Sequence, residues 1–375
     1  MKIGVTGANG FLGYHLVQSI TWLTNNEVVA FNRELFDDSN GLIKFVEECD
    51  VIVHLAGLNR HESDEVLYQT NVNITKALVD ALTRAKNNPH VILSSSSQES
   101  QGNVYGNSKK KARELIDEWA FNGDGLSTGL LIPNVFGPFG KPFYNSVVAT
   151  FCHQIANDKK PQILNDSEVG LIYVNDLVEE IIRIIDDPNS LKRENGVAKH
   201  IISPQKRIFV SKLLDLLSGF KEIYIDNLGF PNLDDEFEKA MFNTFRCYVP
   251  VNFYPKLYVK HTDNRGAFVE IARCNTPGQT SYSTTVPGIT RGNHFHTRKA
   301  ERFAVIKGKA RIQVRRIGTD QIINYELDGN DPSFVDMPIW HTHNIKNIGE
   351  DELVTLFWIN EPYDPADPDT YFEEV

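Results

Sequence analysis

Three glycines near the N-terminus restrict this chain to a small set of folds. The segment TGANGFLG, residues 6–13, follows the apolar run KIGVT at residues 2–6 and precedes a helical pattern over residues 15–23. In this order of strand, turn and helix, Gly7 permits a tight turn, Gly10 lets a pyrophosphate approach the backbone, and Gly13 allows close helix packing. The segment predicts the start of a dinucleotide-binding fold, and the alternative is a glycine-rich turn of purely structural use.

The pattern of apolar residues changes once along the chain. Up to about residue 217, short apolar runs alternate with amphipathic stretches, which predicts a parallel sheet with helices on both faces. After about residue 250 the pattern is one of short alternating strands with Gly and Asp turns, among them residues 270–275, 300–317, 332–339 and 352–360. We therefore expect an α/β Rossmann domain over residues 1–247 and an all-β sandwich or barrel over residues 248–375.

Composition excludes several classes of partner. The chain has 375 residues and a formal net charge of −11, and its longest basic block is the three lysines at 109–111, so nucleic acid and anionic membranes are poor candidate partners. The four cysteines lie far apart without a C-x-x-C pair, which argues against a disulfide framework. No stretch of 18 apolar residues occurs. We expect a cytoplasmic protein without a membrane partner.

The residues after the second predicted strand indicate which coenzyme binds. Chains that bind NAD place an acidic residue about 20 positions after the glycines, where it accepts hydrogen bonds from the ribose. Asn32 and Arg33 occupy that place here. A guanidinium pairs with a phosphate and cannot accept from a hydroxyl, so Arg33 favours the 2′-phosphate of NADPH. The alternative is a solvated loop arginine.

A tyrosine and a lysine supply a candidate proton donor. A predicted strand ends in the serines at 94–97, and Tyr105-Gly106-Asn107-Ser108-Lys109 follows at the start of a helix. The spacing places Tyr105 and Lys109 one turn apart on one face. A lysine ammonium stabilises a phenolate, so we expect Lys109 to lower the pKa of Tyr105 toward the working range of a general acid.

These motifs together resemble the extended short-chain dehydrogenase/reductase family over roughly residues 1–245. Further matching segments are residues 50–57, Asn71 in TNV, and residues 133–138. The resemblance implies a Rossmann fold with a small substrate lobe, with Tyr105 as general acid, Lys109 as its partner on the ribose, and Ser95 or Ser96 on the substrate carbonyl. The coenzyme contacts predicted from the motifs and the resemblance are Gly7, Gly10, Phe11, Leu12, Gly13, Asn32, Arg33, Leu55, Ala56, Gly57, Asn71 and Lys109.

A second cluster of chemical groups lies in the predicted barrel. His294 and His296 are two residues apart and so share one face of a strand, while Glu301 and His343 come from segments that form other strands. Three imidazoles and one carboxylate suit Zn²⁺ or another divalent first-row ion. The alternative is a set of satisfied polar residues at a barrel mouth.

This cluster and its flanking glycines resemble the cupin fold over about residues 250–375. Trp340 stands where cupins usually have glycine. The segments DNRGAFVE at 263–270 and TRGNH at 290–294 also resemble the nucleotide-sugar 3,5-epimerase branch, in which the histidine after Arg-Gly is a base. We assign His294 to the metal and leave the base open among Lys299, His341 and Tyr363.

The whole chain resembles bifunctional enzymes of capsular polysaccharide synthesis in which an extended reductase precedes a cupin. The resemblance implies a homodimer that acts on a UDP-linked 4-keto-6-deoxy N-acetyl sugar. The cupin would epimerise C3, and the reductase would reduce C4 with NADPH to give UDP-2-acetamido-2,6-dideoxy-L-talose, the precursor of UDP-N-acetyl-L-fucosamine. Two alternatives stay open: a reductase whose barrel only mediates dimerisation or docking, and a non-enzymatic NADP(H) sensor.

Overall fold

The computed structural model describes residues 1–123, 125–263, 266–272, 274–276, 278–361 and 363–375. The chain divides into two compact units, each made of separate segments. The first unit comprises Met1–Val147 and Asp166–Val210, and the second comprises Val148–Asn165 and Ser211–Val375.

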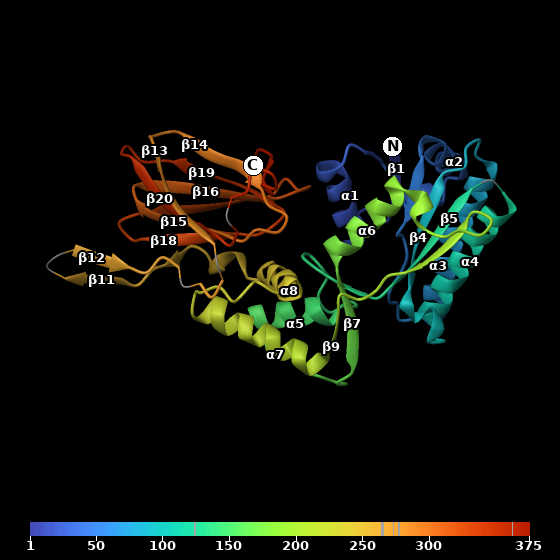
Figure 1. The fold of residues 1–375 in the computed structure, drawn as a ribbon, viewed down its shortest axis with the longest axis horizontal. Helices are drawn as coiled ribbons and strands as arrows, with labels where there is room; N and C mark the ends of the chain where they lie inside the picture. Colours follow the sequence, from blue (N-terminus) through green and yellow to red (C-terminus); the bar gives the residue numbers. More distant parts are fainter. Residues whose placement is uncertain (124, 264–265, 273, 277, 362) are drawn as a thin grey trace. The chain divides into compact units, whose positions relative to one another are not determined.

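A six-stranded parallel sheet is the centre of the first unit. Its strand order is β2-β1-β3-β4-β5-β8. Helices α1 and α6 lie on one side of the sheet, and α2, α3 and α4 lie on the other (Figure 1). The elements are β1 Lys2–Thr6, α1 Phe11–Leu23, β2 Glu27–Val29, α2 Ser39–Glu48, β3 Val51–His54, α3 Asp64–Arg84, β4 His90–Ser96, α4 Val104–Asn122, β5 Leu126–Ile132, α6 Val174–Asp186 and β8 Val197–Ile201. The predicted Rossmann fold is confirmed.

The order of the strands determines where a ligand can bind. Strand β2 lies on one side of β1, and β3 lies on the other, so the order in which strands are added to the sheet reverses between β1 and β3. In open α/β sheets, ligands bind at the carboxyl ends of strands at such a point. Those ends are Thr6 and His54, and they are followed by the turn at residues 7–10 and by residues 55–57.

Local sequence explains the ends of these helices. Helix α1 begins at Phe11, four residues before the predicted start, because Gly10 is already in the extended N-cap conformation. The side chains of Asp38 and Ser63 accept backbone N–H groups at the starts of α2 and α3. A smaller sheet of the same unit has the order β6-β7-β9, with β6 Asn134–Phe136, β7 Glu168–Tyr173 and β9 Lys206–Phe209.

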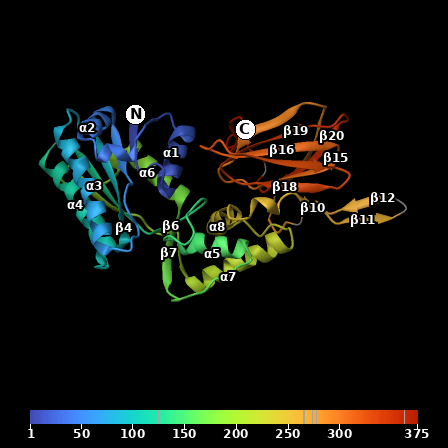
Figure 2. The same cartoon turned by 180° about the vertical axis from the view of Figure 1, so that it is seen from behind.

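Two five-stranded sheets of antiparallel strands make up most of the second unit, with the orders β10-β18-β15-β20-β13 and β17-β16-β19-β14-β21. They lie face to face in both views (Figures 1 and 2). Apolar side chains such as Val305, Ile312 and Ile345 fill the core between them. The strands are β10 Lys256–Leu257, β13 Gln279–Thr285, β14 Thr290–Phe295, β15 Glu301–Lys307, β16 Lys309–Arg316, β17 Ile322–Asp328, β18 Ser333–Met337, β19 His341–Asn347, β20 Leu353–Ile359 and β21 Tyr371–Phe372.

The second unit also contains α5 Val147–Ala156, α7 Val210–Phe220 and α8 Glu236–Arg246, as well as a hairpin of β11 Lys260–Asp263 and β12 Gly266–Val269. The short helical turns of the chain are η1 Arg33–Phe36, η2 Ser97–Ser100, η3 Pro188–Ser190, η4 Lys221–Asp226 and η5 Val251–Phe253. No helix among the described residues combines the length and the apolar character that crossing a membrane requires.

The predicted strand over residues 270–275 is wrong for the described part of that stretch. Among the described residues of this stretch, the only strand-type pairing is an isolated bridge between Cys274 and Phe230, and residues 270–272 join no sheet. Of the predicted motif at 263–270, Asn264 and Arg265 lie outside the described residues.

Candidate functional site

The glycine turn has the geometry that a bound pyrophosphate requires. Gly7 has a φ of +76°, and a Cβ atom there would lie 2.8 Å from the backbone nitrogen of Ala56. A Cβ on Gly13 would lie 2.1 Å from the carbonyl oxygen of Gly7, so only glycine fits. Gly10 is the N-cap of α1 and has no side chain to accept the first N–H groups, including those of Phe11 and Leu12. The positive end of α1 is therefore open to an anion.

The residues after β3 line the same turn. The Thr6 hydroxyl is 2.7 Å from the Nδ1 atom of His54 and accepts the backbone N–H of Ala56 at 3.3 Å. Burial lowers the pKa of His54 to about 3, with a further contribution from the charge of Lys109, so this imidazole is neutral. The predicted contacts Leu55, Ala56 and Gly57 thus lie beside the cradle formed by residues 7–13.

Asn32 and Arg33 follow β2, which ends at Val29, and they form the start of η1. The Asn32 side chain accepts the backbone N–H of Glu34 at 3.4 Å and so caps η1. Arg33 is the first residue of η1 and is exposed. Because this guanidinium at the start of η1 is exposed, it can approach a 2′-phosphate with only a small cost in desolvation free energy.

Asn71 connects the coenzyme edge to the helix that carries Tyr105. Its Oδ1 accepts the N–H of Leu58 at 2.7 Å, and its Nδ2 donates to the Leu58 carbonyl and to the Ser108 hydroxyl, both at 3.0 Å. Ser108 in turn donates to the Tyr105 carbonyl at 2.7 Å. With 2 % exposure, Asn71 acts as a buried bridge that fixes the start of α4.

Tyr105 and Lys109 lie one turn apart near the start of α4, as predicted. Lys109 is 6 % exposed, and its Nζ lies 3.4 Å from the Ser94 hydroxyl. Burial lowers the pKa of Lys109 to about 8, against the opposing charge of Glu99. The pKa of Tyr105, by contrast, is raised to about 12 by burial and by Tyr144, opposite to the expected direction. Lys109 is not among the groups that shift this pKa, and the phenol is protonated at neutral pH.

The serines that end β4 have different partners. The Ser95 hydroxyl donates to Glu99, which also binds Arg113 at 2.9 Å. Ser96 accepts the N–H of Gln98 at 3.1 Å and still has its own proton to donate. Because side chains alternate along a strand, Ser96 shares the face of Ser94, which contacts Lys109, and Ser95 points to the other face.

The four predicted metal ligands converge in the second unit. His294, His296, Glu301 and His343 each offer a ligand atom, and these atoms all lie within 4.8 Å of one another. The Nε2 atoms of His296 and His343 are 3.2 Å and 3.1 Å from the same Glu301 oxygen. Burial, together with the neighbouring His343 and His296, lowers the pKa of His294 to about 4, which leaves its imidazole neutral.

The hydrogen bonds of the histidines fit a bound cation. The Nδ1–H of His296 donates to the Asp369 carbonyl, and that of His343 donates to the His341 carbonyl at 3.1 Å. In neutral imidazoles these bonds leave Nε2 with a lone pair that points at the Glu301 carboxylate. Lone pairs facing a carboxylate repel unless a cation lies between them, so this donor set fits a divalent metal.

Asp369 is a functional candidate that sequence reasoning missed. It lies in the C-terminal strap, residues 367–372, of which Tyr371 and Phe372 pair with β14. Its carboxylate accepts the backbone N–H groups of Thr297, Arg298 and Lys299 at 3.0–3.1 Å, and the residue is 1 % exposed. No local signal marks it, because these partners lie about 70 positions earlier in the chain.

The three candidates for the epimerase base differ in exposure. Lys299 is 2 % exposed, and its Nζ donates to the Pro368 carbonyl at 2.8 Å. His341 donates from Nδ1 to the Ile339 carbonyl at 2.9 Å, and burial lowers its pKa to about 4. Tyr363 is 63 % exposed. None of the three lies in the four-residue cluster.

Trp340, where we expected glycine from the resemblance, has a backbone conformation that favours glycine. Its φ is +57°, a conformation that glycine adopts freely and a tryptophan adopts only at a cost. The side chain is fully buried and stacks on Phe295 with ring centroids 5.5 Å apart, which offsets that cost.

Two family profiles match the chain. That of the NAD dependent epimerase/dehydratase family matches residues 3–198, and that of the polysaccharide biosynthesis C-terminal domain matches residues 261–371. They cover the glycine cradle and the His/Glu cluster respectively.

Similar proteins span the full chain. A UDP-2-acetamido-2,6-beta-L-arabino-hexul-4-ose reductase from Pseudomonas aeruginosa is 36 % identical over 99 % of this chain and 98 % of its own. The crystal structure of the capsular polysaccharide assembling protein CapF from Staphylococcus aureus is 36 % identical, covers 100 % of both chains and has a TM-score of 0.62. The structure of RMD from Pseudomonas aeruginosa, complexed with NADPH, shares the fold at 20 % identity, with a TM-score of 0.51 over 59 % of this chain and 82 % of its own.

Proposed function

Because the chain belongs to the NAD dependent epimerase/dehydratase family, we propose that it is a bifunctional nucleotide-sugar enzyme. It epimerises C3 of a UDP-linked 4-keto-6-deoxy N-acetyl sugar and reduces C4, which gives UDP-2-acetamido-2,6-dideoxy-L-talose, the precursor of UDP-N-acetyl-L-fucosamine for a surface polysaccharide. The substrate class follows the names of the full-length relatives. The observation that carries the proposal is the presence, in one chain, of a Tyr-Lys pair beside a dinucleotide cradle and of a buried His/Glu cluster.

The proposed coenzyme is NADPH, which supplies the hydride when bound. Its pyrophosphate would lie at the start of α1, beside Gly7, Gly10 and Gly13, because these three residues carry no side chain that would block its approach. Arg33 would bind the 2′-phosphate, and Asn32 lies at the same edge. The preference for NADPH over NADH rests on this arginine, since there is no acidic residue at the position to bind a free ribose hydroxyl.

Tyr105 is the proposed general acid of the reduction. As hydride reaches C4, the ketone oxygen becomes an alkoxide and needs a proton, which the protonated phenol of Tyr105 supplies. The raised pKa of Tyr105 keeps this proton in place before reaction. The ammonium of Lys109, one turn away, stabilises the phenolate left behind. Of the two serines, we assign Ser96 to the substrate carbonyl, because the Ser95 proton is used by Glu99.

The cluster in the barrel is the proposed site of epimerisation. The C3 proton is acidic because the neighbouring C4 ketone delocalises the charge left when a base removes it, and return of a proton to the opposite face inverts C3. Zn²⁺ or a similar cation, held by His294, His296, Glu301 and His343, would supply Lewis-acid stabilisation of that charge. The base remains a choice among Lys299, His341 and Tyr363.

The order of the two reactions follows from their chemistry. Epimerisation needs the C4 ketone, and reduction removes it, so C3 is inverted before C4 is reduced. We also propose that the enzyme is a homodimer, as the resemblance of the whole sequence to bifunctional capsular polysaccharide enzymes implies. We place it in the cytoplasm because its four cysteines are free thiols, which a reducing compartment maintains.

The test separates the two activities. The purified chain is incubated with NADPH and a UDP-4-keto-6-deoxy N-acetyl sugar, and absorbance at the coenzyme band and product stereochemistry are followed. The Tyr105→Phe variant is then incubated in deuterated water. We expect no coenzyme oxidation but deuterium at C3 of the recovered sugar. Absence of turnover by the parent chain on any such sugar contradicts the proposal.

The experiment also decides the second candidate, a reductase whose barrel has no catalytic role. The name of the Pseudomonas aeruginosa relative, which mentions reduction alone, favours this candidate. If the parent chain reduces the sugar but Tyr105→Phe introduces no deuterium at C3, the barrel is not an epimerase. A Glu301→Gln variant serves as the control, since it should lose exchange in the bifunctional case and keep reduction of an already epimerised substrate.

A further inference from the structure

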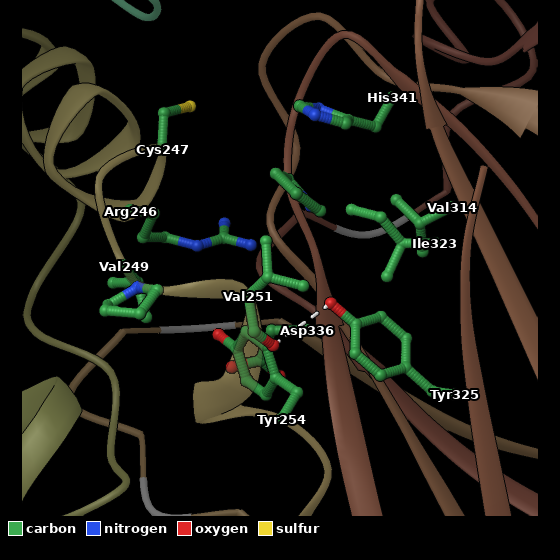
Figure 3. A pocket seen from close by; sticks show the side chains of 12 residues that line it. Arg246, Cys247, Val249, Val251, Tyr254, Val314, Ile323, Tyr325, Asp336 and His341 are labelled. Carbon is green, nitrogen blue, oxygen red and sulfur yellow. Dashed lines mark hydrogen bonds between the residues drawn. The ribbon is translucent and has the colours of Figure 1, made fainter. Parts of the chain in front are cut away.

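The second unit contains a cavity that is lined by none of the four residues of the His/Glu cluster, although the candidate base His341 lies in its wall. Its volume is about 100 Å³, and it lies where the end of α8 and the segment after it meet the strands β16 to β19 (Figure 3). That volume accommodates a few water-sized groups and is too small for a nucleotide. The lining residues include Arg246, Val251, Tyr254, Val314, Ile323 and Asp336.

Arg246 points its guanidinium into this space. The residue is 6 % exposed, and its Nη2 donates to the Met337 carbonyl at 2.6 Å. Across the described part of the chain, no acceptor lies within hydrogen-bond distance of its Nε or Nη1. Figure 3 shows the side chain extending from the end of α8 toward Val251. Three N–H bonds of a buried cation therefore have no protein partner, which is rare in folded proteins.

The charge of the nearby Asp336 carboxylate helps to raise the pKa of Arg246, but the hydrogen bonds of this carboxylate go to other groups. Among the described residues that line the cavity, Asp336 is the only acid, and both of its oxygens bind the Arg302 guanidinium, at 2.7 and 2.9 Å. The Tyr224 hydroxyl also donates to Asp336 at 2.7 Å, and Tyr254 completes the chain by donating to Tyr224. Two guanidiniums thus share one carboxylate, and its lone pairs are directed at Arg302 and Tyr224. A buried positive charge is left over, which is strongly unfavourable unless an anion pairs with it.

We propose that this cavity binds a small oxyanion, a free phosphate or a carboxylate, through the Nε and Nη1 atoms of Arg246. A guanidinium offers N–H bonds in a planar arrangement that matches the oxygens of such groups. Water could accept the same hydrogen bonds but leaves the charge unbalanced. The apolar walls at Val251, Val314 and Ile323 exclude a large hydrated ion and limit the ligand to a compact one.

The bound anion would stabilise the contact between the end of α8 and the barrel. Arg246 is the last residue of α8, and its other contact is the carbonyl of Met337 in β18, which pairs with Glu301 in β15. With its charge neutralised, the guanidinium joins these elements without a residual penalty. This inference does not depend on the proposed reactions, because it concerns only the charge balance of this cavity.

The test measures thermal unfolding of the full chain in sodium phosphate, sodium acetate and sodium chloride at equal ionic strength and pH. A ligand at about 100 times its Kd should raise the unfolding midpoint of a unit of this size by roughly 5–10 °C. We expect phosphate or acetate, but not chloride, to give such a rise. Calorimetric titration with inorganic phosphate and with acetate should then give one site per chain and identify the preferred geometry.

Two variants locate the site. Arg246→Met removes the cation and should abolish the rise. Because Arg246 is buried and this variant could fail to fold, Val251→Trp is the second test: it keeps Arg246 and fills the cavity from a residue that is 55 % exposed. Val286→Trp is the matched control, since Val286 is 60 % exposed and does not line the cavity.

The outcomes separate clearly. Loss of the rise in Val251→Trp and its retention in Val286→Trp supports the oxyanion site. The inference is overturned if phosphate and acetate stabilise the parent chain no more than chloride does. An equal rise in Val251→Trp and the parent chain also overturns it, because the anion would then bind elsewhere, for example at the His/Glu cluster. The limit on ligand size is overturned if the titrations show that UDP binds this cavity but that inorganic phosphate does not bind it.

Discussion

At the scale of single residues, Lys109 is expected to set the alkaline limb of the reductase activity. Its pKa is lowered to about 8, so it is a cation below pH 8 and loses its charge as the pH rises through that value. Since the charge stabilises the phenolate of Tyr105, kcat/KM for reduction should be flat near pH 7 and fall tenfold per pH unit well above pH 8. Steady-state rates of NADPH oxidation between pH 6.5 and 9.5 measure this profile.

The Lys109→Met variant should lower kcat/KM at pH 7 by roughly 10²-fold or more and remove the limb near pH 8. Its neighbour Lys110 is exposed on the same helix, and Lys110→Met should keep both rate and profile. A parent profile that stays flat to pH 9.5 contradicts the role of the Lys109 charge. A limb that survives in Lys109→Met assigns the titration to another group.

What the sequence reveals about single residues depends on how local their constraints are. Gly7 and Gly13 are predictable, because each is required by backbone atoms a few positions away or by the turn itself. The direction of the Tyr105 pKa was not predictable, since burial and Tyr144, which comes from a distant segment, decide it. The same holds for Ser95, whose partner Glu99 is oriented by Arg113 on α4.

At the scale of elements, the C-terminal strap orients the strand end that carries two of the proposed metal ligands. The Asp369 carbonyl accepts the Nδ1–H of His296, and the Asp369 carboxylate accepts three backbone N–H groups at residues 297–299. Groups that orient ligands in this way affect metal affinity by 10- to 100-fold. The strap is thus a positioning element for the His/Glu cluster.

The Asp369→Asn variant should therefore weaken metal binding by roughly 10- to 100-fold. An amide keeps one acceptor oxygen but turns N–H groups toward the donors at 297–299 and removes the negative charge. Retention of Zn²⁺ against a chelator, followed by a colorimetric metal indicator, gives the affinity. Asp367→Asn is the control, because Asp367 is exposed and pairs with Arg298 at the surface, where ion pairs contribute little. Equal affinities of the two variants contradict the positioning role.

Periodicity along the chain predicted strands and helices well where one face of an element is buried. The alternation in β15 and β16 places Phe303, Val305, Ile312 and Val314 in the core between the two sheets. It failed at residues 270–275, where alternating apolar residues accompany only a single bridge from Cys274. A short run of alternating apolar and polar residues has the side-chain pattern of a strand. The pattern does not determine whether a neighbouring strand is available to pair with it.

At the scale of the whole molecule, the chain passes between its two compact units more than once. Residues 148–165, which include most of α5, belong to the second unit although they lie between segments of the first. The profile of the NAD dependent epimerase/dehydratase family also runs through them, over residues 3–198. Composition along the sequence cannot reveal such an interleaving, because the helices of both units are amphipathic in the same way.

Because each unit has its own core and its own candidate ligand site, calorimetry of the full chain should resolve two unfolding transitions.

NADPH at about 100 times its Kd should stabilise the first unit by about 2.7 kcal/mol and leave the unfolding temperature of the second unit unchanged, since a ligand stabilises only the unit that binds it. Removal of the metal with a chelator should lower the other transition alone, because the four proposed ligands then lose the cation that they share. The Arg33→Ala variant provides the control: it should reduce the rise caused by NADPH and leave any rise caused by NADH unchanged, since only the former carries the 2′-phosphate. A single transition that responds to both ligands would mean that the two sites belong to one cooperative unit.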